Sequence, residues 1–222
     1  MSLYHFPRWT DAFRPVLGAA FLVIPTFLVV VFAYGASAEN LNTGYAPEQP
    51  IPFSHRTHAG QLGMDCRYCH YTVEDGAMAA IPPMSTCANC HGQDDVALKI
   101  HPNSAKLKPL ADNWESGDPI EWVRVHDLAE YAYFNHSAHV SAGVGCVECH
   151  GRIDTMEVVT QDQPLSMGWC LECHRQPETR LRPREFVTDM GWTTEEDRFE
   201  LGTRLREQYD INPRTDCSTC HR

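Results

Sequence analysis

The chain carries one long apolar segment near its beginning, and only short, irregular apolar runs after it. Residues 16–34 (VLGAAFLVIPTFLVVVFAY) contain no charged side chain. At about 1.5 Å of rise per residue, a helix of this length crosses the hydrocarbon core of one bilayer. We therefore expect residues 1–38 to form a cytoplasmic N-terminus followed by a single transmembrane anchor.

Charges on the two sides of this run indicate its orientation. Arg8 and Arg14 precede it, and Glu39 is the first charge after it. The positive-inside rule then places the N-terminus in the cytoplasm and everything beyond the run outside. The segment 36–38 (Ala-Ser-Ala) resembles a signal-peptidase site, but the run is longer than the roughly 7–15 apolar residues of a secretory signal. We expect the anchor to stay uncleaved.

The remaining residues predict short helices and long loops with little sheet. Residues 39–52 are polar and rich in proline, as in a linker, and residues 92–133 are expected to be mostly loop. One further helix is expected near residues 194–209, where Leu205 and Tyr209 share a helical face. Thr193 and Glu196 have the spacing of a capping box before it, so we expect the helix to begin there.

All ten cysteines lie in Cys-x-x-Cys-His pentads, of which there are five. This pentad is the attachment motif for c-type haem: two thiols bond to the porphyrin and the adjacent imidazole binds one face of the iron. The predicted attachment cysteines are Cys66, Cys69, Cys87, Cys90, Cys146, Cys149, Cys170, Cys173, Cys217 and Cys220. The predicted proximal ligands are His70, His91, His150, His174 and His221.

Two other uses of cysteine explain the pattern less well. Structural zinc sites use Cys-x-x-Cys pairs, but zinc gives no reason for a histidine after every pair. A disulfide framework would spread cysteines over varied spacings instead of pairing all of them locally. We therefore expect five covalently bound c-type haems as the cofactors.

The haem count also bounds the fold. The chain after residue 40 supplies about 36 residues per pentad, too few for each pentad to build its own apolar core. The porphyrins must contribute much of the buried apolar surface. We expect short helices and long loops around a row of haems, and we expect the haem-free chain not to fold.

An internal repeat organises residues 53–222, the predicted periplasmic pentahaem domain. A Phe-x-His-x-x-His box begins at Phe53 and again at Phe134, and each box is followed by two pentads. The two copies span about residues 53–92 and 134–175, and the terminal haem motif lies at 217–221. The domain therefore contains two di-haem units and one single-haem unit.

Histidines outside the pentads are the candidate distal ligands. Residues i and i+3 of a helix project from one face, so the two histidines of one box reach two different irons. We expect His55 to serve the haem of His70, His58 that of His91, His136 that of His150 and His139 that of His174. Bis-histidine iron has no open position for a substrate, and no residue is predicted to be catalytic.

The fifth distal ligand has several candidates. His126 lies in an apolar stretch and is favoured over His101, which lies in a polar loop. Met167 is a further candidate, because a methionine ligand raises the potential of haem iron. Gap filling in the core is the competing interpretation for Met167 and also for Met84, each of which lies three residues before a pentad.

Net charge is −11, and the deficit lies beyond the apolar run. Such a surface is a poor partner for nucleic acid. It is compatible with a partner that has a basic docking patch, although acidic surfaces also serve solubility.

Several segments resemble known multihaem families. The Phe-x-His-x-x-His boxes resemble class III multihaem cytochromes. Residues 119–128 (PIEWVRVHDL), 133–140 (YFNHSAHV) and 165–175 (LSMGWCLECHR) are similar to the pentahaem subunit of alternative complex III. The resemblance covers most of the chain, and His126 lies within one of its motifs.

This resemblance implies a function. In that family the pentahaem subunit belongs to a bacterial inner-membrane complex that oxidises quinol and passes electrons to a periplasmic cytochrome or a terminal oxidase. The partners implied are an iron–sulfur subunit, polytopic quinol-binding subunits and a monohaem cytochrome c. A tetrahaem-type quinol dehydrogenase with its own quinol site is the alternative, and a multihaem reductase with one open iron is a more distant one.

Overall fold

The computed structural model describes residues 6–35, 42–92 and 97–221. The chain divides into two compact units, Met1–Asn42 and Thr43–Arg222. The proposed cleavage site at residues 36–38, Glu39 and the first residues of the predicted linker lie outside the described residues.

The first unit contains one long helix. The short 3₁₀-helix η1 (Arg8–Ala12) leads into α1 (Phe13–Gly35), which contains Pro25. None of the α1 side chains is buried. Its length and composition are those of a membrane-crossing helix, with a mean hydropathy of 2.7 over its most apolar window.

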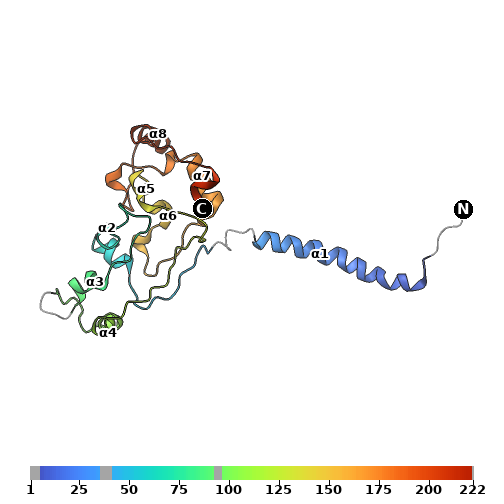
Figure 1. Ribbon diagram of the computed structural model, residues 1–222, viewed down its shortest axis with the longest axis horizontal. Helices are drawn as coiled ribbons and strands as arrows, with labels where there is room; N and C mark the ends of the chain where they lie inside the picture. Colours follow the sequence, from blue (N-terminus) through green and yellow to red (C-terminus); the bar gives the residue numbers. More distant parts are fainter. Residues whose placement is uncertain (1–5, 36–41, 93–96, 222) are drawn as a thin grey trace. The chain divides into compact units, whose positions relative to one another are not determined.

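The second unit consists of short helices joined by long loops (Figure 1). Its α-helices are α2 (Cys66–Cys69), α3 (Met84–His91), α4 (Lys108–Ser116), α5 (His136–Ser141), α6 (Val147–His150), α7 (Met167–Arg175), α8 (Arg198–Gln208) and α9 (Cys217–Cys220). The π-helical η3 (Arg56–Gln61) and the 3₁₀-helices η4 (Ala105–Leu107), η5 (Ile153–Thr155), η6 (Glu178–Arg180) and η7 (Arg184–Phe186) lie between them. Extended pairing in the described ranges is limited to two isolated bridges, Ala132 with His221 and Val144 with Leu181.

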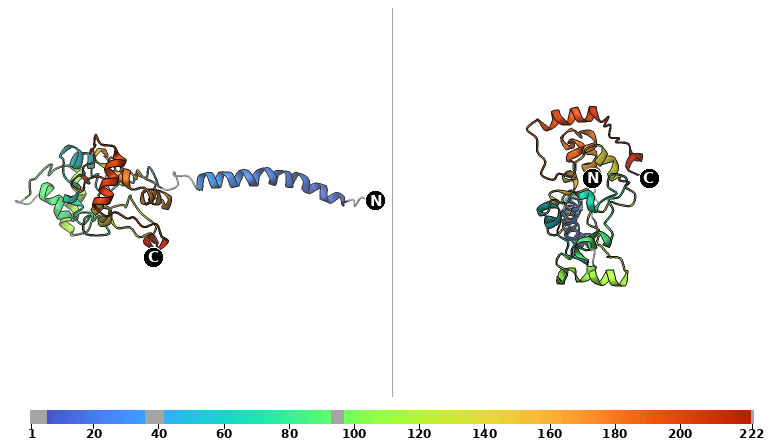
Figure 2. Two further views of the ribbon diagram at one scale, coloured as in Figure 1. Left: turned by 90° about the horizontal axis from the view of Figure 1, so that it is seen from above. Right: turned by 90° about the vertical axis from the view of Figure 1, so that its left-hand side faces the viewer.

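The internal repeat is visible in the order of elements. In the first copy η3 carries the histidine box, and α2 and α3 carry the pentads. In the second copy α5 carries the histidine box, and α6 and α7 carry the pentads. Helix η3 is a π-helix, in which each hydrogen bond spans one residue more than in an α-helix. Such turns are often found at functional positions. In Figures 1 and 2, α3 and α4 lie at one end of the second unit, α7 and α8 lie at the other, and α2 and α6 lie between them.

The apolar core of this unit is small. Leu181, Leu201, Leu205 and Ile211 form its central cluster, and Trp192 packs against them. Gly202 in α8 lies so close to the backbone of Glu178 that a Cβ at this position would overlap the carbonyl group of Glu178. The core therefore depends on close packing of α8 against η6, far from α2 and α3.

Residues 92–133 are mostly loop as expected, but they also contain one helix that was not predicted, and the predicted start of the helix near residues 194–209 was wrong. Residues 92–133 contain α4, which has a proline in its first turn and ends at Gly117 in a left-handed conformation with φ of 78°. Burial of Leu110 holds this helix against the rest of the unit. The helix near residues 194–209 begins at Arg198, because the carboxylate of Asp197 accepts hydrogen bonds from Phe199 N and Glu200 N.

The predicted linker is partly incorporated into the second unit. Gly44 N donates to Gln161 O at 2.8 Å, and Gln161 N donates to Tyr45 O at 3.0 Å. The Gln49 side chain likewise exchanges hydrogen bonds with the backbone of Val123. These contacts order the chain from Gly44 onward.

Candidate haem-binding sites

Each pentad includes a helical turn; α2, α6 and α9 are about one turn long, and α3 and α7 begin a further turn before their pentads. We number these positions sites 1 to 5 in chain order, beginning at Cys66, Cys87, Cys146, Cys170 and Cys217. At site 1 the backbone N–H of the motif histidine donates to the backbone carbonyl of the first cysteine at 2.9 Å. Sites 3 and 5 show the same backbone hydrogen bond at 3.0 and 2.9 Å. One turn places residues i, i+3 and i+4 on the same side. Both thiols and the imidazole of a pentad can therefore face one porphyrin.

The cysteines are chemically available for thioether bonds. All ten are free, Cys217 is exposed and the other nine are partly covered. Burial raises the pKa of Cys69, Cys87, Cys170 and Cys173. The described structure thus contains no disulfide that would compete with attachment.

Most motif histidines are held by one ring nitrogen. Nδ1 of His70, His91 and His174 lies 2.8 Å from a backbone carbonyl, that of Ala80, Ile100 and Arg214 respectively. His221 Nδ1 lies 3.2 Å from Tyr131 O. A carbonyl oxygen can only accept a hydrogen bond, so Nδ1 carries the proton and Nε2 keeps its lone pair for a metal.

The histidine boxes show the same arrangement. His58 Nδ1 lies 2.8 Å from Ser54 O, His139 Nδ1 lies 2.7 Å from Asn135 O, and His136 Nδ1 lies 2.9 Å from Ala77 O. The phenylalanine of each box packs on its histidines; Phe53 stacks on His58 with 4.4 Å between ring centroids. The box motif therefore fixes both the tautomer and the orientation of its imidazoles.

Ring distances identify two facing histidine pairs. The centroids of His58 and His91 are 6.1 Å apart, and those of His139 and His174 are also 6.1 Å apart. Two imidazoles that bind one iron from opposite faces place their centroids about 6 Å apart, given a metal–nitrogen distance near 2 Å on each side. Both pairs therefore have the separation that bis-histidine ligation at sites 2 and 4 requires.

Site 3 has two neighbouring candidates. The ring of His136 lies 6.5 Å from that of His150 and nearly parallel to it, whereas His126 contacts His150 at 4.5 Å with the rings inclined by 73°. The first separation suits opposite faces of an iron, and the second is too short for it. His126 lies at site 3, and the aromatic ring beside His221 at site 5 is that of Tyr131, at 5.8 Å.

Buried imidazoles at sites 1 and 3 remain neutral. Burial, followed by the charges of His70 and His58, lowers the pKa of His55 to about 4. Burial, followed by His126 and His136, lowers the pKa of His150 to about 3. Burial also lowers the pKa of His126 and of His139. Neutral imidazole is the form that binds a metal.

Three of these histidines have a buried ring nitrogen with no hydrogen-bond partner among the described residues. The atoms are His55 Nδ1, His126 Nε2 and His150 Nδ1. Buried polar atoms are nearly always satisfied, so these atoms indicate that a further group belongs beside these rings, and His126 Nε2 is the one of the three that corresponds to the metal-facing nitrogen of the paired histidines. The donor set and the ring separations fit c-type haem.

The two less favoured candidates lie apart from these pairs. Met167 begins α7 and is 66% exposed. His101 is exposed and adopts a φ of 52° in the loop that follows site 2. The structure does not bring either of them to a motif imidazole in any described contact.

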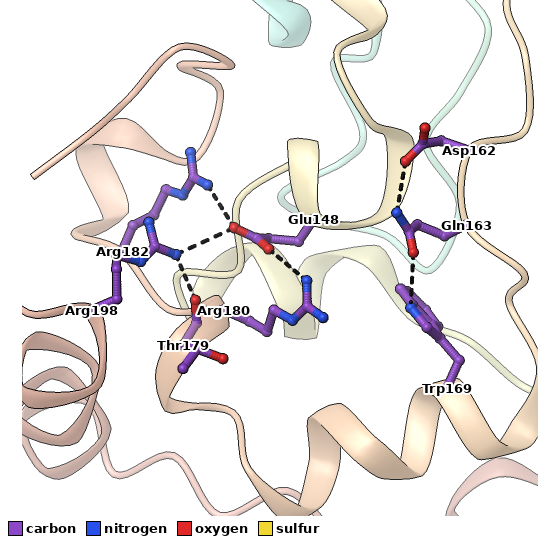
Figure 3. Close-up of polar contacts among 8 residues, drawn as sticks. All are labelled: Glu148, Asp162, Gln163, Trp169, Thr179, Arg180, Arg182 and Arg198. Carbon is purple, nitrogen blue, oxygen red and sulfur yellow. Dashed lines mark hydrogen bonds and ion pairs between the residues drawn. The ribbon is translucent and has the colours of Figure 1, made fainter.

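Sequence reasoning missed a charged cluster at site 3. Glu148, inside the third pentad, accepts hydrogen bonds from Arg180 at 3.1 Å, Arg182 at 2.9 Å and Arg198 at 3.4 Å (Figure 3). Arg182 is 2% exposed, and its guanidinium lies over Trp192. Because site 4 has a glutamate at the same pentad position, the sequence offered no pattern that distinguishes Glu148.

A second polar chain connects site 3 to site 4 (Figure 3). Trp169, which precedes the fourth pentad, donates from Nε1 to Gln163 Oε1 at 3.1 Å, and Gln163 donates to Asp162 at 2.7 Å. The Asp162 carboxylate lies against Gly151, where a Cβ would approach to 2.5 Å, and Gly151 has a φ of 61°. Only glycine suits this position directly after His150.

The fold and these sites have the character of a multihaem cytochrome c. Residues 132–222 match the family described as cytochrome c7 and related cytochrome c, and residues 33–109 match the class III cytochrome C family. Members of these families carry covalently bound c-type haem, with which the ten cysteines agree.

A curated relative is similar to part of the chain. It is the "Menaquinone reductase, multiheme cytochrome c subunit" of Nitratidesulfovibrio vulgaris, with 34% identity over 133 residues, or 60% of this chain. The match spans 59% of that relative's length. Over this region the chain is similar to a multihaem cytochrome c subunit.

Proposed function

We propose that the chain is a membrane-anchored pentahaem c-type cytochrome that carries electrons between a quinone-reactive membrane complex and a redox partner outside the cytoplasm. The observation that carries the proposal is the facing of histidine rings at 6.1 Å at both site 2 and site 4. Rings so placed close both faces of an iron and leave no position for a substrate. Haem supplies the one-electron chemistry, and the protein adjusts its potential through ligands, burial and charge.

The ligands proposed for each site follow from the contacts. The motif histidines serve as proximal ligands, with His58 opposite His91 and His139 opposite His174. His136 is the distal ligand proposed for site 3, since its ring is parallel to that of His150 at 6.5 Å. His55 remains the candidate for site 1.

We further propose that α1 anchors the chain in the bacterial inner membrane, with the haem unit in the periplasm. Helix α1 has the length and apolar composition for one crossing. Arg8 and Arg14 lie at its N-terminal side, as the positive-inside rule requires for a cytoplasmic N-terminus. Attachment of c-type haem on the outer side of that membrane agrees with this topology.

The complex proposed is alternative complex III, with an iron–sulfur subunit, quinol-binding polytopic subunits and a monohaem cytochrome c as partners. In that setting electrons pass from quinol toward a periplasmic cytochrome or a terminal oxidase. The name of the relative favours a second candidate, in which electrons travel toward menaquinone. The two candidates share the cofactor sites and differ in the direction of flow.

One experiment separates these candidates. The complex is extracted in mild detergent through a tag on this chain, its subunits are identified, and haem absorbance is followed after addition of quinol or of a reduced periplasmic cytochrome. Reduction by quinol in the complex, and none in the isolated chain, supports the main proposal, whereas reduction of the complex by the reduced periplasmic cytochrome and not by quinol supports the second candidate. Reduction by quinol in the isolated chain would instead show a tetrahaem-type quinol dehydrogenase with its own quinol site.

A further inference from the structure

We propose that the five sites form one row in the spatial order 2–1–3–4–5, so that sites 2 and 5 are its two ends. The spatial order thus differs from the chain order. The inference rests on haem attachment at all five sites, as proposed above. It assigns the two positions where electrons enter and leave the chain.

Sites 2 and 1 are neighbours through the first histidine pair. His58 faces His91 of site 2, and one helical turn earlier His55 lies near His70 of site 1. The loop between the two sites makes the same connection. His70 Nδ1 lies 2.8 Å from the carbonyl of Ala80, which precedes α3 by only a few residues.

Sites 1 and 3 both contact the consecutive residues Val187 and Thr188. Cys146 N donates to Val187 O at 2.9 Å, and Cys66 Sγ lies 3.9 Å from Thr188 O. Thr188 also donates to the Asp65 carboxylate that caps α2. Two pentads that share a dipeptide in this way lie side by side, although 80 residues of chain separate them.

Sites 3 and 4 are neighbours through the second histidine pair. His136 faces His150 of site 3, and one turn later His139 faces His174 of site 4. The Trp169–Gln163–Asp162 chain reinforces this contact from the other side.

Sites 4 and 5 are joined by a short segment. His174 Nδ1 lies 2.8 Å from Arg214 O, and Arg214 Nε donates to Asp216 Oδ1 at 2.9 Å. Asp216 is the residue before α9, the helix of site 5.

The two ends of the row lie at different surfaces. Cys217 of site 5 is the exposed attachment cysteine, and the exposed Tyr131 accepts from His221 through its backbone carbonyl. At the other end, Leu98 is 70% exposed and its N–H donates to Asn89 O inside the pentad of site 2. Sites 1 and 3 lie between these ends, and the ring nitrogens His55 Nδ1 and His150 Nδ1 are buried there.

The test injects electrons at each end separately. Because haem attachment consumes the native thiols, a cysteine introduced as Leu98→Cys or Glu130→Cys is a unique position for a ruthenium photosensitiser. Glu130 is exposed and precedes Tyr131 at site 5. The Leu98 label lies at site 2 and the Glu130 label at site 5, and flash photolysis measures the rate of the first haem reduction from each label.

Each label is combined with removal of one end site, either Cys87→Ser with Cys90→Ser or Cys217→Ser with Cys220→Ser. Loss of site 2 should slow reduction from the Leu98 label by an order of magnitude or more and leave the rate from the Glu130 label unchanged. Loss of site 5 should give the reverse, so each label is the control for the other. A removal that slows both labels equally, or neither, overturns the order.

Haem counting keeps the two proposals separate. Fewer than five haems in the parent chain contradict the proposed function, whereas five haems without the crossed pattern contradict only the order. If a removal variant does not fold, electron cryo-microscopy of the parent chain decides instead. The distance between the irons of sites 2 and 5 should then be the largest of all iron–iron distances, and a larger distance between any other two irons contradicts the row.

Discussion

Arg182 donates a hydrogen bond to Glu148 at 2.9 Å while its own side chain is 2% exposed. With Arg180 and Arg198, three guanidinium groups meet one carboxylate inside the third pentad. The carboxylate of Asp189 is a further negative group nearby, bonded to Gly191 N. The cluster still carries an excess of positive charge beside site 3, where burial weakens screening.

This excess should raise the reduction potential of the haem at site 3, because positive charge favours the ferrous state. Arg198→Gln should lower that potential and Glu148→Gln should raise it. At an effective dielectric constant of about 20, one charge in this cluster should contribute on the order of 1 kcal/mol, or some tens of millivolts. Spectroelectrochemical titration of the purified holoprotein measures both shifts.

Arg204→Gln is the control, since Arg204 pairs with Glu196 and lies outside this cluster. It should leave all five potentials unchanged. Shifts of the same sign in the Arg198 and Glu148 variants would indicate a general structural disturbance, and would contradict the electrostatic role.

Removal of one distal ligand should open one iron. His58→Ala deletes the imidazole that faces His91, so one haem of five should become high-spin and bind carbon monoxide. His101→Ala is the matched control, because His101 is exposed and outside the described ring contacts. Electron paramagnetic resonance and carbon monoxide difference spectra report the change. Carbon monoxide binding in the His101 variant alone would reverse the two assignments.

The contrast between His58 and His126 shows how far the sequence could determine the site. The His-x-x-His spacing predicts which pentads each box can reach, because only one helical turn separates the two imidazoles. His126 belongs to no such pair, and its position beside His150 depends on how residues 119–133 fold back across the second copy. Long-range packing of this kind leaves no local pattern. The same holds for Glu148 and its three arginines, because Arg180 and Arg182 lie in one segment, Arg198 lies in another, and both are distant in sequence from Glu148.

In the fold, too, some elements could be predicted from the sequence and others could not. Pentads and boxes predict the short helices because each motif contains its own turn, and the charge-free run predicts α1 from length alone. Helix α4 was missed although Leu107, Leu110, Ala111 and Trp114 have helical spacing, because the run is short and lies in a polar, proline-containing segment that resembles a loop.

Acid should weaken the contact between sites 1 and 3. The side chain of Arg67 is the main cause that lowers the pKa of Asp65 from 3.8 to about 2, and Thr188 contributes a further hydrogen bond. A lowered carboxylate pKa stabilises the folded state above the unfolded value, and this contribution disappears as pH falls from about 4 to about 2. Asp65→Asn should therefore flatten the loss of stability over that range in thermal unfolding of the holoprotein. An unchanged profile would show that Asp65 does not contribute.

The haem-free chain should not fold cooperatively. Among the described residues only ten hydrophobic side chains are buried, and the central cluster lies around α8. So small a core does not offset the conformational entropy of the roughly 175 residues that the structure describes in the second unit. Replacement of all ten cysteines by serine should give a chain with no sigmoidal transition in urea. A cooperative transition with native-like helix content would show that the polypeptide is sufficient.

The central claim is that this chain binds c-type haem at all five pentads. Pyridine haemochrome analysis of the purified full-length protein, set against its polypeptide concentration, tests it most directly. The account predicts five equivalents of haem c per chain, and a ratio of four or fewer in fully matured protein would contradict it.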